Sequence, residues 1–376
     1  MENGRVAIVT WFHYINYGTA LQVFAEKNYI EKKGYLVEVV QYYPEIPPMY
    51  YKSKLNEYLA RGKNKLYKLT HSRKIIDTYG QEVFQSFINE NLPLTERVET
   101  AADFEALNDK FDCFVCGSDQ IWSPLNFDPH YFLDFVTDPS KMIAYAPSLG
   151  VSHIDRPGDD KKIAELTNRF KYLSVREKTG AELIRKLNGR EARVVLDPTF
   201  LLYKDDWDRL VPGEAEGQPY VLAYFLRENK KYWKAVNEVA KKLQLEIKVI
   251  PVFEDDLKMS GARTGAGPDD FVRLIRGASF ICTDSFHGMA FAVNFNKQFL
   301  PFQRFASGAK DSQNSRVYDF LDSVGLKDRI YDGGRVDKYL KKIEYKPVNE
   351  KLEVLRRKSK EYLDGALEEI TNYCNG

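Results

Sequence analysis

The stretch FICTDSFHGMAFAV spans Phe280–Val293 and joins two patterns of different period. Its opening apolar run predicts a buried strand, and its closing run predicts a helix. Asp284 or Ser285 can cap that helix, which places His287 at the helix N-terminus. Backbone amides and the helix dipole favour anions there, and Gly288 leaves space for a ligand. The stretch is therefore a candidate acid–base site, and the alternative is a histidine that hydrogen-bonds within a domain interface.

The same change from strand to helix recurs along the chain. RVAIVTWF predicts a strand covered on both faces, and TALQVFAEKNYIEKKG predicts an amphipathic helix with Thr19 as N-cap and Gly34 after its end. YLVEVVQYY then completes a β-α-β unit. Four further strand patterns end in small or polar residues, namely FDCFVCGSDQIW, MIAYAPSLG, YLSVREKTG and RVVLDPTFLL.

A second series of strands and helices begins with EGQPYVLAYFL, which predicts a boundary near residues 203–218. Domains usually contain ~100–200 residues, so two are expected in 376 residues. Alternating strands and helices predict an α/β fold with a parallel, doubly wound sheet in each half. We expect one domain over 1–210, a second over 211–346, and an amphipathic helix over 347–376.

Residues 44–100 lack this alternation and predict a helical, basic insertion in the first domain. Between Lys52 and Lys74 there are eight lysines and arginines and one acid, Glu57. Two interpretations stay open: a solvated helical face, or a basic patch for an anionic membrane or glycolipid.

The composition is that of a globular protein, with 44% hydrophobic and 29% charged residues. A net charge of +1 disfavours binding to nucleic acid. Cys113 and Cys116 lie three apart in one predicted strand and so face opposite ways, which predicts buried thiols rather than a metal or redox pair. No histidine pair has metal-ligand spacing, so we expect no metal. Without an apolar membrane span or signal-like start, we expect a cytoplasmic protein, at most peripheral at the inner face of the membrane.

Ligands of doubly wound sheets bind beyond the carboxyl ends of the strands, and the polar clusters fall there. We therefore expect the site in a cleft between the two halves. The candidates at these strand ends are Asn16, Gly18, Gly117, Ser118, Asp119, Arg176, Asp197, Asp284, Ser285, Phe286, His287 and Gly288.

Several of these stretches together resemble the polysaccharide pyruvyl transferase family. TDSFHGMAFAVNFNKQFLPF is similar to that family's signature, and so are FDCFVCGSDQIW, AYAPSLG, LSVREKTGAELI and VVLDPTFLL, in the order that the family shows them. VTWFHYINYGTALQ also resembles its N-terminal block, so the likeness runs from about Val6 to Arg329. The resemblance implies two Rossmann-like domains that face each other across a cleft, as in glycosyltransferase-B folds, with a C-terminal helix that returns to the first domain.

The resemblance also implies the transfer of pyruvate from phosphoenolpyruvate to a sugar hydroxyl pair of a cell-surface polysaccharide, as a ketal, with release of phosphate. The family's S-F-H-G histidine corresponds to His287 and its S-x-R-E arginine to Arg176. We expect His287 to act as acid–base and Arg176 to clamp the anionic donor, with no cofactor beyond phosphoenolpyruvate. For Arg176 a structural ion pair with Glu177 or Asp197 is the alternative.

The remaining candidates divide between donor and acceptor. We expect donor contacts from Ser285, Phe286, Gly288, Gly117, Ser118 and Arg316, and acceptor contacts or support from Asn16, Gly18, Asp119, Asp197 and Asp284. The expected partners are phosphoenolpyruvate and a saccharide or lipid-linked oligosaccharide, and the sequence indicates no oligomeric state. Two alternatives stay open: a glycosyltransferase that uses a nucleotide sugar, and a non-catalytic member that binds a glycan or a partner enzyme.

Overall fold

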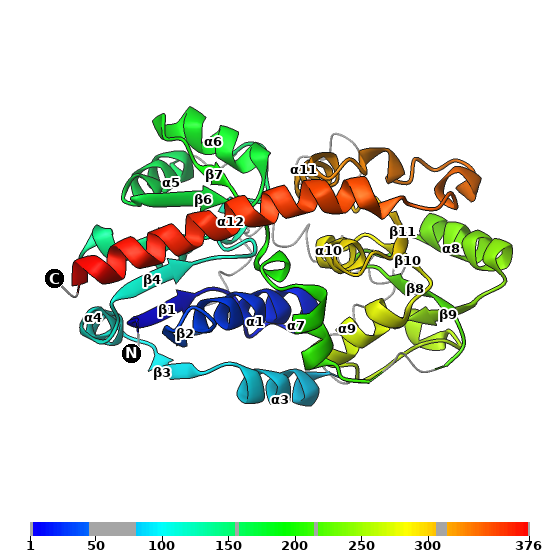
Figure 1. Cartoon of the computed structure of the whole chain (residues 1–376), viewed down its shortest axis with the longest axis horizontal. Helices are drawn as coiled ribbons and strands as arrows, with labels where there is room; N and C mark the ends of the chain where they lie inside the picture. Colours follow the sequence, from blue (N-terminus) through cyan, green and yellow to red (C-terminus); the bar gives the residue numbers. More distant parts are fainter. Residues whose placement is uncertain (1–2, 45–79, 155–157, 214–216, 306–313, 375–376) are drawn as a thin grey trace, which may run out of the picture.

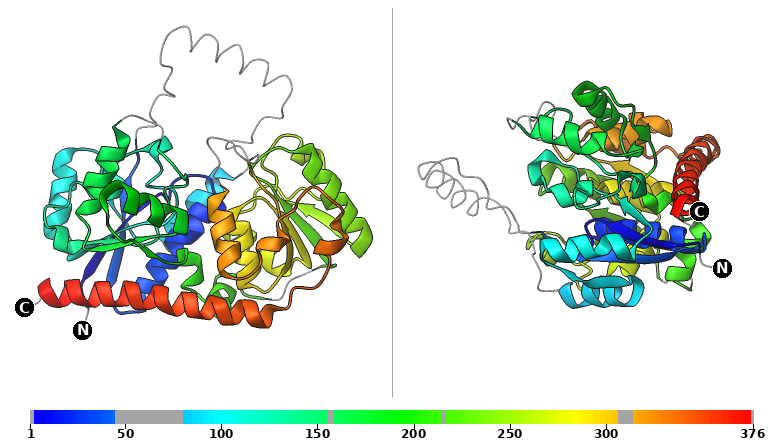
Figure 2. Two further views of the ribbon diagram at one scale, coloured as in Figure 1. Left: turned by 90° about the horizontal axis from the view of Figure 1, so that it is seen from above. Right: turned by 90° about the vertical axis from the view of Figure 1, so that its left-hand side faces the viewer.

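The computed structural model describes residues 3–44, 80–154, 158–213, 217–305 and 314–374. Two α/β units lie side by side, and one long helix runs across both of them (Figures 1 and 2). The basic segment 52–74 lies outside the described residues. The predicted α/β fold with two parallel sheets is confirmed.

The first unit contains a parallel sheet of seven strands in the order β3-β2-β1-β4-β5-β6-β7. Its strands are β1 (Arg5–Val9), β2 (Leu36–Tyr42), β3 (Leu94–Val98), β4 (Cys113–Cys116), β5 (Met142–Ala144), β6 (Tyr172–Val175) and β7 (Arg193–Val194). Its helices are α1 (Tyr17–Glu31), α3 (Gln81–Asn91), α4 (Ala101–Lys110), α5 (Asp159–Asn168) and α6 (Lys178–Asn188).

Helix α7 (Lys204–Leu210) leads from this unit to the second one, and we keep residue 210 as the proposed domain boundary. The second sheet is also parallel, in the order β11-β10-β8-β9. Its strands are β8 (Tyr220–Tyr224), β9 (Glu246–Val249), β10 (Phe280–Thr283) and β11 (Gln298–Pro301). Its helices are α8 (Lys230–Leu243), α9 (Pro268–Gly277), α10 (Phe286–Asn294) and α11 (Ser315–Ser323).

Helices cover both faces of the first sheet, which explains why its central strands are apolar without alternation. In β1, Val6 and Ile8 belong to one buried cluster while Ala7 and Val9 belong to another. Cys113 and Cys116 also divide between these two clusters, so the two thiols face opposite sides of the sheet, as predicted.

One apolar cluster continues from the first unit into the second. Tyr17 of α1 stacks on Phe271 of α9, with ring centroids 4.8 Å apart. Trp207 of α7 lies between Phe24 of α1 and Phe291 of α10, at centroid distances of 5.8 and 4.8 Å. The two units therefore share a core, and burial of these large rings stabilises their relative placement.

The long helix α12 (Tyr345–Cys374) crosses from the second unit to the first (Figure 2). Arg356 donates to Phe200 O at 2.7 Å and to Asn294 Oδ1 at 3.1 Å, so it contacts both units. Further along, Tyr362 Oη donates to Ala144 O at the end of β5. Neither α12 nor any other described helix stays apolar over a membrane-spanning length.

Two local predictions are wrong. The N-cap of α1 is Asn16 rather than Thr19, because Asn16 is extended and its side chain accepts from the amides of Gly18 and Thr19. Residues 94–98 were assigned to the helical insertion, yet they form β3 beside β2. An edge strand leaves much of its surface in water, so the sequence LTERV carries no apolar run that would identify it.

We predict that Leu363→Ala destabilises the chain through loss of α12 packing. Leu363 is fully buried, and truncation of such a leucine costs about 2–5 kcal/mol in free energy of unfolding. Glu361→Ala, on the exposed face of the same helix, should change it by less than about 0.5 kcal/mol. Urea unfolding of both variants measures the difference, and equal stabilities would show that α12 is only loosely attached.

Candidate functional site

Both sheets bring their carboxyl ends to one region. The strand order reverses between β1 and β4 in the first sheet and between β8 and β10 in the second. Such reversals open the crevices in which doubly wound sheets bind ligands. The residues that follow β1, β4, β7 and β10 meet there.

His287 is the second residue of α10 and points from the second unit toward the first. Ser285 caps the helix, with its Oγ accepting from the amide of Gly288 at 3.2 Å. The His287 Nε2 lies 3.3 Å from Asp197 Oδ2, which belongs to the first unit. This contact across the two units orients the imidazole.

Gly18 is required by the position of the His287 ring. A Cβ atom built on Gly18 would lie 1.9 Å from His287 Nδ1. The first turn of α1 and the first turn of α10 therefore touch at this point. Gly18 provides space for the imidazole, which sequence reasoning had not foreseen when it predicted an acceptor contact.

Asp197 connects the two units. Its Oδ1 accepts from the amide and hydroxyl of Thr199 at 3.0 and 2.8 Å, and its Oδ2 accepts from Arg176 Nη1 at 2.7 Å. Burial by itself would raise the pKa of Asp197, but the charges of His287 and Arg176 hold it well below its usual range. Asp197 is therefore an ionised anchor for the Arg176 guanidinium and the His287 imidazole.

Arg176 has a buried guanidinium group, and only some of its N–H groups donate to a described residue. Its side chain is 2% exposed and lies 4.6 Å from the centre of the Phe286 ring. Beyond the bond to Asp197, its Nη2 lies 3.8 Å from Asp119 Oδ1. Neither Nε nor Nη2 has a hydrogen-bond acceptor among the described residues. Because a buried N–H without an acceptor is costly, these donors indicate a binding position for an anion.

Arg316 adds a second buried guanidinium beside Arg176. Burial, followed by the charges of Arg176 and Arg304, lowers the pKa of Arg316 to about 9. Helix α11, which carries Arg316, is attached to α6 because Asp319 accepts from the amide and hydroxyl of Thr179 at 2.9 and 2.8 Å. Mutually repelling cations in a buried place are stabilised when an anion binds between them.

The turn that follows β4 holds the neighbouring loops in place through buried contacts. Gly117 has φ +131°, and a Cβ there would lie 1.8 Å from Tyr145 O. Ser118 is fully buried, with its amide donating to Gln22 Oε1 and its Oγ to Ala146 O, each at 2.9 Å. Both residues thus have structural contacts, and the contact predicted for them with the donor substrate stays a prediction. Asp119 lies closer to Arg176. Its Oδ2 accepts a 2.7 Å hydrogen bond from Thr19 Oγ1, and its Oδ1 lies 3.8 Å from Arg176 Nη2.

Sequence reasoning missed Gln22. This fully buried side chain of α1 donates to Thr10 Oγ1, Trp11 O and Thr19 O at 3.2 Å each, while it accepts from Ser118. It therefore ties the loop after β1 to the turn after β4. The signal was present, since Gln22 interrupts the apolar run ALQVFA.

Three other candidate residues, Asn16, Asp284 and Gly288, make contacts that hold the fold together. Asn16 caps α1, and Asp284 accepts from the amides of Leu226 and Arg227 at 2.7 and 3.2 Å, which fixes the loop after β8. The prediction that Gly288 leaves space for a ligand is wrong, because a Cβ there would lie 2.7 Å from Thr283 Oγ1. Helix α10 needs this glycine to pack on β10. Among the described residues, no three His, Cys, Asp or Glu side chains could hold a metal ion.

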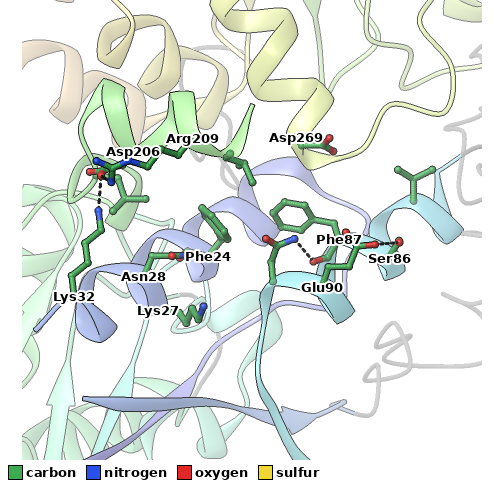
Figure 3. A pocket seen from close by; sticks show the side chains of 14 residues that line it. Phe24, Lys27, Asn28, Lys32, Ser86, Phe87, Glu90, Asp206, Arg209 and Asp269 are labelled. Carbon is green, nitrogen blue, oxygen red and sulfur yellow. Dashed lines mark hydrogen bonds and ion pairs between the residues drawn. The ribbon is translucent and has the colours of Figure 1, made fainter. Parts of the chain in front are cut away.

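A cavity of about 620 Å³ lies elsewhere, between α1, α3, α7 and α9 (Figure 3). Phe24 and Phe87 line it together with several charged side chains. Three of those charges pair with one another, since Asp206 binds both Lys32, at 2.5 Å, and Arg209, at 3.0 Å. The cavity therefore lacks the convergent buried donors found around Arg176, and we assign it to the junction between helices.

We predict that Gly18→Ala displaces the His287 ring. The new methyl group overlaps Nδ1, so the free energy of unfolding should fall by about 1–3 kcal/mol and the histidine NMR signals should shift. Gly365→Ala is the matched control, because no atom lies within 4 Å of its added Cβ and alanine favours a helix by about 0.5–1 kcal/mol. A Gly18→Ala protein with unchanged stability and spectrum would contradict this packing.

We also predict a pH-dependent stabilisation by Asp197. Its folded pKa lies below the unfolded value of about 3.9, so the carboxylate stabilises the fold above about pH 4 and loses this contribution as the pH falls. Asp197→Asn should cost about 3–5 kcal/mol at pH 7. The difference from wild type should shrink at pH 3. Urea unfolding at both pH values tests this, with exposed Asp205→Asn as control; an equal difference at both would contradict it.

Comparisons with known proteins identify the family. Similar solved structures include UDP-GlcNAc 2-epimerase from Methanocaldococcus jannaschii, with 14% identity, a TM-score of 0.49, and coverage of 94% of this chain and 99% of that one. UGT89C1 from Arabidopsis thaliana, complexed with UDP-L-rhamnose, has 12% identity, a TM-score of 0.48, and coverage of 99% and 100%. E. coli heptosyltransferase WaaC with ADP has 11% identity, a TM-score of 0.40, and coverage of 86% and 98%. Likeness at this level carries no argument about activity.

A search of curated protein sequences found no match. The sequence profile of polysaccharide pyruvyl transferases matches residues 16–304, which is more than half of the chain. The matched residues include Asp119, Arg176, Asp197 and His287, and the match confirms the resemblance noted in the sequence. The chain belongs to the polysaccharide pyruvyl transferase family.

Proposed function

We propose that the chain transfers pyruvate from phosphoenolpyruvate to two hydroxyls of a sugar in a cell-surface polysaccharide or its precursor, forming a ketal and releasing phosphate. The observation that carries the proposal is the buried guanidinium of Arg176, whose free donors lie beside His287 at the meeting point of the two units. Membership of a pyruvyl transferase family supports the kind of reaction.

The donor requires a strongly cationic site. Phosphoenolpyruvate carries a phosphate and a carboxylate on one enol carbon. A guanidinium fork matches either group, and Arg176 has Nε and Nη2 available for it. Arg316 supplies the second charge, and its lowered pKa reflects a position that an anion would stabilise. Two anionic groups on one small molecule would thus neutralise a pair of repelling cations.

The reaction also requires proton transfer. Protonation of C3 makes C2 electrophilic, one sugar hydroxyl attacks C2, phosphate leaves, and the second hydroxyl closes the ketal. Of the two hydroxyl protons, one ends on the new methyl group and the other on phosphate. We assign His287 to move a proton between these positions, because its imidazole lies at the junction of the two units and Asp197 holds it in place through Nε2.

We predict that phosphoenolpyruvate binds the wild-type protein in calorimetry and that Arg176→Ala weakens binding about 10–100-fold. Arg176→Lys should restore little, because it keeps the charge but loses the fork. His287→Gln should keep binding while phosphate release falls about 10²–10⁴-fold, measured with methyl hexopyranosides whose hydroxyl pairs can close five- or six-membered ketals.

Arg185→Ala, an exposed change on α6, is the control and should bind like wild type. Melting curves of each variant separate loss of binding from loss of folding. Binding of UDP-sugars without binding of phosphoenolpyruvate would refute pyruvyl transfer and favour a nucleotide-sugar glycosyltransferase.

A further inference from the structure

We propose that four aromatic side chains at the carboxyl end of the first sheet bind a neutral hexopyranose unit of the acceptor by stacking. We call Trp11, His13, Tyr14 and Tyr43 the aromatic platform. This inference rests on the proposed function, since it names the binding surface of the acceptor. Of the residues predicted for the acceptor, Asn16 caps α1 and Asp284 fixes the loop after β8, and their contact with an acceptor stays a prediction.

The platform lies at the strand ends that face the site. Trp11, His13 and Tyr14 belong to the loop between β1, which ends at Val9, and α1, which begins at Tyr17. Tyr43 directly follows β2. Because β2, β1 and β4 are neighbours and parallel, their ends share one edge of the sheet with Asp119.

The four rings form a continuous row. Trp11 and Tyr14 meet edge to face with centroids 5.3 Å apart, His13 lies 4.2 Å from Tyr14, and His13 lies 5.1 Å from Tyr43. The row rests on buried rings, since Phe12 lies 5.7 Å from Tyr43 and Tyr131 lies 6.2 Å from Trp11. Gln22 fixes the loop by donating to Trp11 O. Buried rings and the Gln22 side chain therefore hold the platform in a fixed position.

The platform is open to solvent. All four of its side chains are half-buried, whereas Phe12 in the same loop is fully buried. Ile15, which follows Tyr14, is 41% exposed. Apolar surface that is contiguous and exposed marks an interaction site more often than a packing defect.

Tyr14 connects the platform to the anion site. Burial raises the pKa of Tyr14, and the negative charges of Asp128 and Asp119 raise it further. Asp119 in turn lies 3.8 Å from Arg176. A sugar stacked on the platform would therefore lie at the same edge of the first sheet as Asp119 and Arg176.

The chemistry of the platform fits a neutral sugar. A hexopyranose has an apolar face of C–H groups that packs on aromatic rings, and a rim of hydroxyls that needs polar partners. Tyr and Trp offer rigid area at low entropic cost together with polar atoms. Arg97 lies 5.2 Å from the centre of the Tyr43 ring, so the platform has a cation at one end and the negative charges of Asp128 and Asp119 at the other, beside Tyr14.

Saturation-transfer NMR with methyl β-glucoside, methyl β-galactoside, methyl β-mannoside and their N-acetylamino analogues tests the platform. At least one probe should bind through its C–H face. Trp11→Ala should weaken that binding about tenfold or more. Tyr14→Phe should weaken it about threefold, because only a hydroxyl is lost. Trp233→Phe, on α8 of the second unit, is the control and should bind like wild type.

Calorimetry with phosphoenolpyruvate on the same preparations separates the two proposals. Unchanged sugar binding by Trp11→Ala, or no binding of any probe, overturns the platform, and donor binding that persists in the same samples leaves the proposed function standing. Sugar binding that depends on Trp11, without any phosphoenolpyruvate binding, supports the platform and overturns pyruvyl transfer.

Discussion

The site depends on one buried carboxylate, that of Asp197, which contacts Arg176 of the first unit and His287 of the second. Arg176 bonds to it at 2.7 Å and His287 approaches it at 3.3 Å. In a poorly solvated place, such a carboxylate is stable only with its partners, and the partners are stable only with it. Asp197 thus fixes a guanidinium and an imidazole near one another without taking up all of their donors.

That contact would be weak if the two units could move apart freely. The rings of Tyr17, Trp207 and Phe271 extend one apolar core across the junction, and α12 bonds to both units through Arg356. Burial of large aromatic area is non-directional and stabilises the contact between the two units. The contacts of His287 with Asp197 and with Gly18 then fix how the two units are positioned against each other. The geometry of the site is therefore a property of the interface and belongs to neither sheet alone.

The surroundings of the site divide by chemistry. On one side lie buried arginines, which suit a small molecule with two anionic groups. On the other side lie half-buried rings at the ends of β1 and β2, which suit a neutral sugar face. Asp119 lies between them, bonded to Thr19 and near both Arg176 and Tyr14. A reaction between an anionic donor and a neutral acceptor needs such a boundary, because an anion and an apolar face require opposite environments.

The sequence by itself determined the alternation of strands and helices, the strand-to-helix junction at His287, and the family, because periodicity and local motifs depend on neighbouring residues. The sequence did not identify strand β3, because an edge strand need not be apolar. The sequence also did not identify the partners of the polar residues and glycines. Asn16 caps α1, Asp284 holds the loop after β8, and Gly288 packs against Thr283.

Only the tertiary structure decided that Gly18 faces His287 across the two units, that Asp197 contacts both Arg176 and His287, and that Gln22 supports the turn after β4. Those contacts join residues up to 269 positions apart in the chain, between Gly18 and His287. No local pattern encodes such a pairing, because its energy exists only once the two sheets have packed together.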